Sequence, residues 1–200
     1  MIELWIAALD RPLSGVETQM LTAALPERRR ERLERLREET WRREPLCAYG
    51  LLLRALQNRF GWQTLPTLEY SSSGKPHFPD WPDVHFSISH TDGAVMVGLA
   101  DREIGVDIEK IRPVKEVVLR RFDCGGEAAF FETWVRREAR AKRLGTPVEL
   151  GTESPLLPGE QIVYPEGVFR GYAACAVWME EEKAVLHCLT LKEILEEHKA

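Results

Sequence analysis

The sequence predicts an α+β fold made of two related halves, residues 1–102 and residues 103–200. Two observations indicate this fold. Each half passes from helical apolar spacing into strands with apolar residues at every second position, and no low-complexity linker separates the halves. A chain of 200 residues with 44% hydrophobic residues is long enough to bury the cores that such halves need. We expect a functional site where the halves meet.

Residues 1–25 predict a strand followed by a helix. Apolar side chains occupy alternate positions over residues 2–6, as in a half-buried strand. Ser14 and Glu17 have the spacing of a capping box, which predicts a helix that runs until Pro26 interrupts it.

An arginine-rich segment follows, in which glutamates are interleaved with arginines over residues 27–44. One interpretation is a solvated helix with ion pairs between residues four positions apart. The other is that Arg28, Arg32 and Arg43 present a cationic face to a phosphate or to an acidic partner. The sequence alone leaves both interpretations open.

Apolar residues at helical spacing predict a core helix over residues 45–59 that ends at Gly61. Residues 71–76 then form a predicted loop, in which Lys75 stands between a glycine and a proline. A single loop lysine commonly serves only solubility, but this one directly precedes a stretch with unusual polar clusters.

That stretch, residues 84–109, predicts three successive strands. Apolar and polar residues alternate in the first and third strands, and the second is more continuously apolar. In an up-down-up meander the first and third strands finish at the same edge of a sheet. We therefore expect Ser89 to lie near Asp107. Their neighbours His90 and Glu109 should lie at the same edge.

Asp107 and Glu109 share one face of their strand, so each carboxylate would raise the pKa of the other unless a cation lay between them. A hard divalent metal ion with phosphate oxygens as further ligands suits such a pair. The alternative is that both side chains form the solvated face of an edge strand.

Two further helices are predicted, a short one over residues 114–121 and a longer one over residues 127–144 with Gly145 as its C-cap. In the longer helix Glu138 occupies a position where the pattern calls for an apolar side chain, and a carboxylate there needs a partner. Lys142, four residues on, would supply an ordinary ion pair. Alternatively, both side chains point into a site shared with the strand carboxylates.

The last quarter of the chain predicts β structure. Strands are expected over residues 161–164, 169–178 and 184–190, and a short charged tail follows over residues 191–200.

Composition limits the classes of function. The formal net charge of −5 does not suggest nucleic-acid binding, and no apolar run approaches membrane-spanning length. Cys47, Cys124, Cys175 and Cys188 form no CxxC pair, so neither a zinc site nor a redox dithiol is indicated. The N-terminus is too short and too acidic for a signal peptide, and we expect a cytoplasmic protein with reduced cysteines.

Four short motifs occur in one order: residues 74–76 (GKP), 86–91 (FSISHT), 105–109 (GVDIE) and 134–142 (WVRREARAK). Together they resemble the 4′-phosphopantetheinyl transferases, and the pseudo-dimeric, surfactin-synthetase-activating type in particular. Each motif alone is weak, but four in register are specific. The resemblance implies two similar α/β subdomains in a pseudo-two-fold arrangement, with the active site at their junction. Two such halves in one chain make a monomer the simplest expectation.

The resemblance also implies a reaction and its site residues. Such enzymes move the phosphopantetheine arm of coenzyme A onto a serine of an apo acyl or peptidyl carrier protein and release adenosine 3′,5′-bisphosphate. Mg²⁺, bound to the pyrophosphate, would be surrounded by Asp107, Glu109 and Glu138. Glu138 would act as the general base, since it lies on a helix opposite the strand carboxylates.

Basic and polar residues would hold the phosphates of coenzyme A. The resemblance assigns the 3′-phosphate and the pyrophosphate to Lys75, Ser89 and His90, and lets Lys142 reach the pyrophosphate. With the arginines of residues 27–44, the candidate coenzyme A ligands are Arg28, Arg32, Arg43, Lys75, Ser89 and His90. The candidate catalytic residues are Asp107, Glu138 and Lys142.

Three departures from the family pattern leave a second function open. Arg137 replaces a lysine, Glu44 follows Arg43 where a hydroxyl residue is usual, and the segment between Phe122 and Phe130 is short. A non-catalytic relative that binds coenzyme A or a carrier protein would tolerate such changes, although pure binding would not need all the acidic residues. A nucleotide pyrophosphatase ranks below both, because neither its acidic helix motif nor a phosphate-binding GxxxxGK[ST] loop occurs in the sequence.

Overall fold

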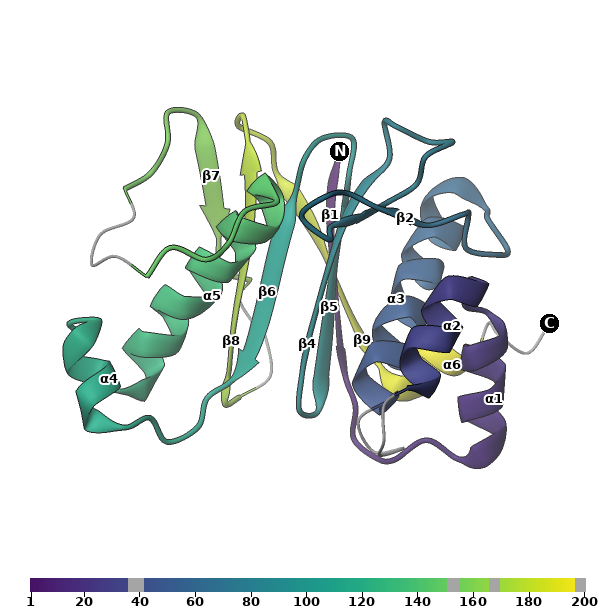
Figure 1. Cartoon of the computed structure of the whole chain (residues 1–200), viewed down its shortest axis with the longest axis horizontal. Helices are drawn as coiled ribbons and strands as arrows, with labels where there is room; N and C mark the ends of the chain where they lie inside the picture. The colour runs from purple at the N-terminus through teal and green to yellow at the C-terminus, as the bar shows by residue number, and fades with distance from the viewer. Residues whose placement is uncertain (36–41, 151–154, 166–169, 197–200) are drawn as a thin grey trace.

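The computed structural model describes residues 1–35, 42–150, 155–165 and 170–196 and has the α+β character predicted from the sequence (Figure 1). Its helices are α1 (Gly15–Ala23), α2 (Glu27–Glu34), α3 (Arg43–Phe60), α4 (Glu116–Arg121), α5 (Glu127–Leu144) and α6 (Leu191–Glu196). Its strands are β1 (Ile2–Ala8), β2 (Glu69–Tyr70), β3 (Pro76–His77), β4 (His85–Thr91), β5 (Ala94–Ala100), β6 (Gly105–Lys110), β7 (Glu160–Val163), β8 (Tyr172–Met179) and β9 (Ala184–Thr190).

The described strands form two main sheets and one short hairpin. The first sheet has the order β4-β5-β1-β9, with β9 parallel to β1 and the other neighbours antiparallel. The second sheet has the antiparallel order β6-β8-β7, and β2 pairs only with β3. The predicted division at residues 102 and 103 falls in the connection between the sheets, and β9 returns from the second half to the first sheet.

Three hydrophobic cores hold these layers together. One lies between α3 and the first sheet, and a second joins the two sheets through side chains such as Ile6, Met96 and Val106. The third packs α5 on the second sheet around Phe131 and Val135. The helices α3 and α5 therefore flank the sheets on opposite sides (Figure 1), and the edges β4 and β6 lie side by side between them.

The predicted meander of three consecutive strands is wrong in its pairing. Strands β4 and β5 form the expected hairpin, but β1 occupies the other edge of β5, so β6 cannot pair there. Strand β6 pairs with β8 instead and meets β4 only through side chains. The expected proximity of the polar residues on the first and third strands nevertheless holds, because β4 and β6 are neighbours.

Local sequence signals explain several of the helix ends. The Ser14 hydroxyl accepts a hydrogen bond from the Glu17 amide, and the Glu17 carboxylate accepts one from the Ser14 amide, which confirms the capping box. Gly61 and Gly145 end α3 and α5 with positive φ of 73° and 66°, as a left-handed C-cap requires. These caps fix where the two long helices stop beside the sheets.

The charged tail predicted after the last strand begins with a helix, α6. Thr190 and Glu193 form a second reciprocal capping pair, and Leu191, Ile194 and Leu195 are buried against the core around α3. The sequence analysis missed this helix because charged residues dominate the segment and only three of its described positions are apolar and buried. The rest of the predicted tail, residues 197–200, lies outside the described part.

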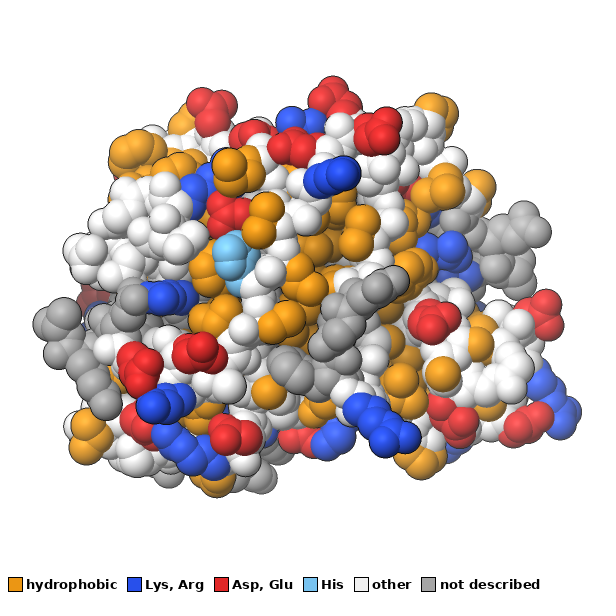
Figure 2. All heavy atoms as spheres, turned by 180° about the vertical axis from the view of Figure 1, so that it is seen from behind, with side chains coloured by type: hydrophobic (Ala, Val, Ile, Leu, Met, Phe, Trp, Pro, Cys, Tyr) orange, Lys and Arg blue, Asp and Glu red, His pale blue; other side chains and the backbone are white. Residues whose placement is uncertain are grey.

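The face seen in Figure 2 lies behind the view of Figure 1, and hydrophobic side chains gather near its middle with charged side chains around them. Among the hydrophobic side chains of the edge strand β9, Val185 and Leu186 are exposed at 49% and 37%. In the described part of the chain, no helix combines the length and the apolarity needed to cross a membrane.

Candidate active site

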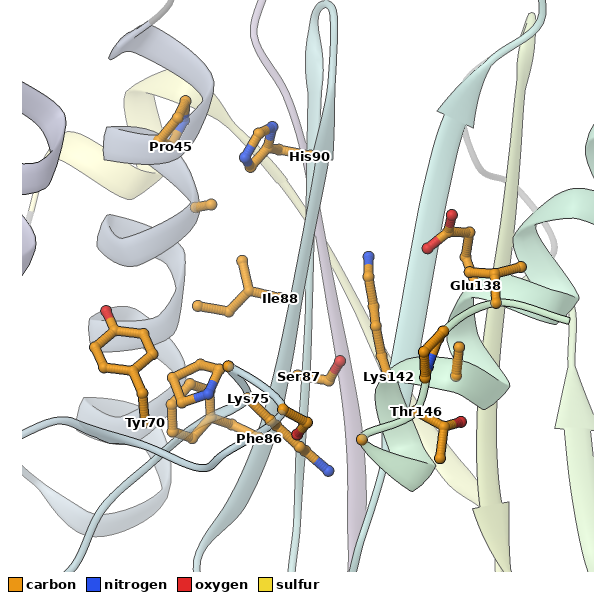
Figure 3. A pocket seen from close by; sticks show the side chains of 18 of the residues that line it. Pro45, Tyr70, Lys75, Phe86, Ser87, Ile88, His90, Glu138, Lys142 and Thr146 are labelled. Carbon is orange, nitrogen blue, oxygen red and sulfur yellow. The ribbon is translucent and has the colours of Figure 1, made fainter. Parts of the chain in front are cut away.

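A cavity of about 390 Å³ lies between α3 and α5, above the adjacent strands β4 and β6 (Figure 3). One wall carries Tyr49 of α3 and Tyr70 of β2, and the opposite wall carries Glu138 and Lys142 of α5. His90 of β4 lines the cavity at the end nearer the start of α3. The cavity thus combines aromatic, cationic and anionic groups drawn from both halves of the chain.

Asp107 is the most deeply buried acid at this site, with 3% exposure. Its Oδ1 accepts hydrogen bonds from the Ser89 hydroxyl and from the Lys142 ammonium, each at 2.7 Å. Its Oδ2 is buried and has no hydrogen-bond partner among the described residues. Burial raises the pKa of the Asp107 carboxyl, which the positive charge of Lys142 partly offsets.

Glu109 lies two residues further along β6 and nearer the surface. Its carboxylate accepts hydrogen bonds from the Thr91 hydroxyl at 3.2 Å and from the Arg112 guanidinium at 2.8 Å. Both predicted strand carboxylates are therefore held by hydroxyl groups of β4 and by one cation each.

Glu138 reaches the cavity from α5 and is half-buried. Burial raises the pKa of its carboxyl, and the neighbouring charges of Asp107 and Glu109 raise it further. The hydrogen bond of Lys142 goes to Asp107, so Lys142 connects α5 with β6. The structure thus favours the prediction that Glu138 and Lys142 both point into a site shared with the strand carboxylates.

The residues present fit a hard divalent cation. In the described part of the chain, no three or more His, Cys, Asp or Glu side chains are already gathered to hold a metal. Mg²⁺, however, commonly takes one or two protein carboxylates and completes its coordination with water and substrate phosphates. The buried, unpartnered Oδ2 of Asp107, with the Glu138 carboxylate nearby, offers oxygens of this kind. The Mg²⁺ site formed by Asp107, Glu109 and Glu138 stays a prediction, and the carboxylate oxygens present are suitable ligands for this ion.

His90 is accessible to solvent within the cleft. The protein walls around it and the positive charge of Lys142 lower the pKa of its imidazole. At neutral pH this favours the uncharged ring, which donates one hydrogen bond and accepts another. His90 is therefore suited to a polar contact with a ligand in the cavity.

Two other predicted phosphate ligands have their polar atoms engaged by the protein. The Lys75 ammonium forms an ion pair with Glu103 and donates to the Arg143 carbonyl at 3.1 Å. The Ser89 hydroxyl donates its one hydrogen to Asp107. Lys75 borders the cavity, and both residues tie elements of the site together.

Curated proteins resemble the chain over most of its length. A 4′-phosphopantetheinyl transferase of Bacillus subtilis is 28% identical over 163 residues, covering 73% of the chain and 71% of the relative. The 4′-phosphopantetheinyl transferase Sfp of Bacillus subtilis strain 168 is 27% identical over 161 residues, with the same coverage of 73% and 71%. The 4′-phosphopantetheinyl transferase AcpT of Salmonella typhi is 31% identical over 126 residues, covering 55% of the chain and 60% of the relative.

The chain is similar to the 4′-phosphopantetheinyl transferases over 73% of its length. It is an enzyme of this type and is similar to Sfp, so the resemblance predicted from four short motifs is confirmed. No family model matches the chain.

In this phosphopantetheinyl transferase the arginine that lines the cavity is Arg29, which the sequence analysis missed. Its guanidinium carbon lies 4.8 Å from the ring centre of Tyr49, and its Nε has no hydrogen-bond partner among the described residues. Arg28, which was predicted, is exposed and stacks 5.5 Å from the ring centre of Tyr70. The position of Tyr49 beside α2 determines that Arg29, and not its neighbour Arg28, faces the cavity. No local sequence signal could have distinguished these two adjacent arginines.

The other two predicted arginines lie differently. Arg43 borders a second, larger cavity of about 940 Å³ that shares His90 and Pro45 with the first, and its guanidinium pairs with Glu44 and Asp92. Arg32 belongs to α2, but its side chain lies outside the described part of the chain.

Proposed function

We propose that the enzyme transfers the 4′-phosphopantetheine arm of coenzyme A to a serine of an apo acyl or peptidyl carrier protein. The reaction depends on Mg²⁺ and releases adenosine 3′,5′-bisphosphate. One observation carries the proposal: the buried carboxylate of Asp107 leaves one oxygen unpartnered while Lys142 holds the other, beside a cleft that Lys142 and Glu138 line. This arrangement suits a ligand that brings both phosphate oxygens and a metal ion.

The transfer replaces the phosphoanhydride linkage of coenzyme A by a phosphate ester linkage to the carrier serine. The carrier serine oxygen forms a bond to the β-phosphorus of coenzyme A, and the bond from that phosphorus to the bridging oxygen breaks. The bridging oxygen leaves with the electron pair as part of adenosine 3′,5′-bisphosphate, and the serine proton passes to the Glu138 carboxylate. Because burial and neighbouring carboxylates raise the pKa of Glu138, it is a stronger base than an ordinary glutamate.

Lys142 has the second task, which is to stabilise charge on the transferring phosphoryl group. Its side chain is 31% exposed and borders the cavity, so its ammonium can contact a phosphate while it keeps its hydrogen bond to Asp107. Mg²⁺, held by Asp107 with Glu109 and Glu138, would supply further charge neutralisation on the phosphate oxygens when bound.

The remaining contacts to coenzyme A come from the cavity walls. His90 and Arg29 offer hydrogen-bond donors to phosphate, and Tyr70 offers a flat apolar surface of the kind that accepts a nucleobase. Lys75 borders the same cavity and remains a candidate once its ion pair with Glu103 is exchanged for a phosphate. Arg28, Arg32 and Arg43 are candidates for weaker electrostatic contacts with coenzyme A or with an acidic carrier protein.

We further propose that the two halves are related by a pseudo-two-fold axis and that the enzyme acts as a monomer in the cytoplasm. What supports the axis is that each main sheet is covered by one helix of 18 residues, α3 on the first sheet and α5 on the second. The carboxylates and the cavity lie where β4 and β6, one edge of each sheet, come together.

Intact-mass analysis of apo acyl and apo peptidyl carrier proteins, incubated with the enzyme, coenzyme A and Mg²⁺, tests the function. We expect a gain of about 340 Da, the mass of one phosphopantetheine arm, which is lost when EDTA removes the metal. Asp107→Ala should abolish it, and Glu138→Gln should lower turnover by about 10²- to 10⁴-fold. Glu132→Gln, an exposed glutamate on the same helix, is the matched control and should retain turnover.

Two results would change these assignments. Nearly full turnover of Glu138→Gln at saturating Mg²⁺ would remove Glu138 as the base. No mass gain on any carrier, with coenzyme A still bound in calorimetry, would favour a non-catalytic protein that binds coenzyme A. The three departures from the family pattern, at Arg137, at Glu44 and in the short segment between Phe122 and Phe130, favour this second function.

A further inference from the structure

Three hydroxyl groups join the two sheets at the active site. Strands β4 and β6 share no backbone pairing, and the amides of β6 that face β4 donate to side chains instead. The hydrogen bonds run from Val106 to Ser87 at 3.1 Å, from Ile108 to Ser89 at 3.3 Å, and from Lys110 to Thr91 at 3.3 Å. These hydroxyls therefore fix the position of β6 relative to β4.

Two of the three hydroxyls also hold a carboxylate. Ser89 donates to Oδ1 of Asp107 at 2.7 Å, and Thr91 donates to Oε2 of Glu109 at 3.2 Å. Among the described residues, Ser87 has no recorded hydrogen bond to a carboxylate, although its own hydroxyl accepts the amide hydrogen bond of β6. The set thus contains two members that touch an acid and one that does not.

The hydrogen bonds leave these hydroxyls little capacity for a ligand. A hydroxyl has a single hydrogen, and Ser89 is buried at 5% exposure with that hydrogen directed to Asp107. The same bond, together with Lys142, occupies Oδ1 and leaves Oδ2 as the one oxygen of Asp107 without a described partner. Ser89 thereby determines which oxygen of Asp107 stays available.

We propose that Ser89 and Thr91 are positioning residues, which orient Asp107 and Glu109 toward the metal and phosphate site and do not themselves bind coenzyme A. The inference rests on the proposed function, because it assigns these hydroxyls to the metal site of that reaction. Groups that hold a metal-binding carboxylate in place commonly change metal affinity by about 10- to 100-fold when they are removed. Ser89→Ala and Thr91→Val remove the hydroxyls and retain most of the side-chain volume.

Ser87→Ala is the matched control. It removes an equivalent hydrogen bond to a β6 amide, at 3.1 Å, from the same strand at similar burial. All three substitutions should lower the melting temperature, because each leaves an amide of β6 without its acceptor, buried at Val106 and Ile108 and partly buried at Lys110. Ser87 lines the cavity but touches no carboxylate among the described residues, so an effect on metal affinity separates the positioning role of Ser89 and Thr91 from the role of Ser87.

The test measures Mn²⁺ affinity of the full-length enzyme by electron paramagnetic resonance at saturating coenzyme A, with coenzyme A alone as the blank. We expect Ser89→Ala and Thr91→Val to weaken Mn²⁺ binding by about 10- to 100-fold, and Ser87→Ala to change it less than about threefold. Thr91→Ser, which keeps the hydroxyl, should restore the affinity. In transfer assays the apparent constant for Mg²⁺ should rise while the KM for coenzyme A stays within about twofold.

Several results would overturn the proposal. They are unchanged Mn²⁺ affinity in both variants, an equal loss in Ser87→Ala, a rise in the KM for coenzyme A without a change in metal affinity, or no Mn²⁺ binding by the wild-type enzyme. Transfer by the wild-type enzyme is measured separately. Active enzyme with equal Mn²⁺ affinity in all variants would therefore reject the positioning roles alone, and inactive wild-type enzyme would reject the proposed function.

Discussion

The ammonium of Lys142 lies 2.7 Å from Oδ1 of Asp107, although 35 positions separate the two residues in the chain. Lys142 comes from the last turn of α5 and Asp107 from the middle of β6, so this contact connects the helix to the strand at the candidate active site. Because Asp107 is buried, the lysine charge also offsets part of the cost of keeping a carboxylate there.

Lys142→Met should therefore reduce activity through charge. We expect kcat to fall by about 10²- to 10³-fold, since one preorganised cation at the transferring phosphoryl group is removed. Lys192→Met is the control, because Lys192 is 81% exposed on α6 and pairs only with the neighbouring Glu196 in the recorded contacts. Steady-state kinetics of both variants checks the expectation, and a kcat of Lys142→Met within twofold of the wild type would contradict it.

Gly105 allows α5 to approach β6 closely enough for that contact. A Cβ at Gly105 would lie 1.8 Å from the Ala139 carbonyl oxygen and 2.5 Å from the Arg143 amide nitrogen. Both are backbone atoms of α5, so the helix would have to move away from the strand. The displacement would carry Glu138 and Lys142 with it.

Gly105→Ala should consequently lose both stability and activity. Overpacking of this kind costs about 1–3 kcal/mol, which lowers the melting temperature by about 2–12 °C in a chain of this size. Gly15→Ala is the control, because no atom lies within 4 Å of a Cβ placed there. Calorimetry and the transfer assay measure the two effects, and a melting temperature equal to that of Gly15→Ala would show that α5 packs differently.

Short-range patterns were sufficient to predict much of this site. The alternation around Asp107 gave the strand and the face of its carboxylate, and the anomalous polar position of Glu138 on an apolar stripe indicated a shared site. These signals depend on residues two to four positions apart, and the backbone geometry of strands and helices fixes such relationships.

Other features depended on packing between distant segments, which the sequence pattern does not encode. The pairing of β6 with β8 follows from β1 filling the free edge of β5, more than 80 positions away in the chain. Likewise, the choice between Arg28 and Arg29 depends on where Tyr49 lies relative to α2. The contacts that engage Lys75 and Ser89 likewise involve residues far away in the sequence: Glu103 and Arg143 for Lys75, and Asp107 for Ser89.

Glu17 in the capping box of α1 should make the free energy of unfolding depend on pH in the acidic range. The Arg11 guanidinium, and next the Ser14 amide, lower the pKa of Glu17 from its ordinary value of 4.5 to about 2. A carboxyl whose pKa is lowered in the folded state stabilises that state fully above its unfolded pKa. The contribution is then lost as the pH falls from about 4.5 to about 2.

Glu17→Gln is therefore expected to cost about 1 kcal/mol of unfolding free energy at pH 7, and the difference from wild type should shrink as the pH falls toward 2. Ser14→Ala should show a loss that persists further into acid, because the missing hydroxyl does not titrate. Urea unfolding at several pH values measures both. A constant difference between wild type and Glu17→Gln across this range would contradict the assignment.

Arg28 and Arg29 are adjacent in sequence but lie in different surroundings. Substituting each in turn can therefore distinguish a direct contact with a ligand in the cavity from a general effect of positive surface charge. Arg29 lines the cavity beside Tyr49, whereas Arg28 is exposed over Tyr70. An arginine that donates to a phosphate in a cleft contributes a charge-assisted hydrogen bond, and its removal commonly weakens binding by about tenfold or more. Removal of an exposed arginine has a small effect that salt screens.

Arg29→Met should accordingly raise the KM for coenzyme A by about tenfold with little change in kcat, and the increase should persist at about 0.5 M salt. Arg28→Met, the matched control, should change the KM less than about threefold, and that change should vanish in salt. Steady-state kinetics at two ionic strengths distinguishes them. Equal effects of both substitutions would mean that α2 contributes only a diffuse positive field, and the phosphate contacts would then belong to His90, Lys75 and Lys142.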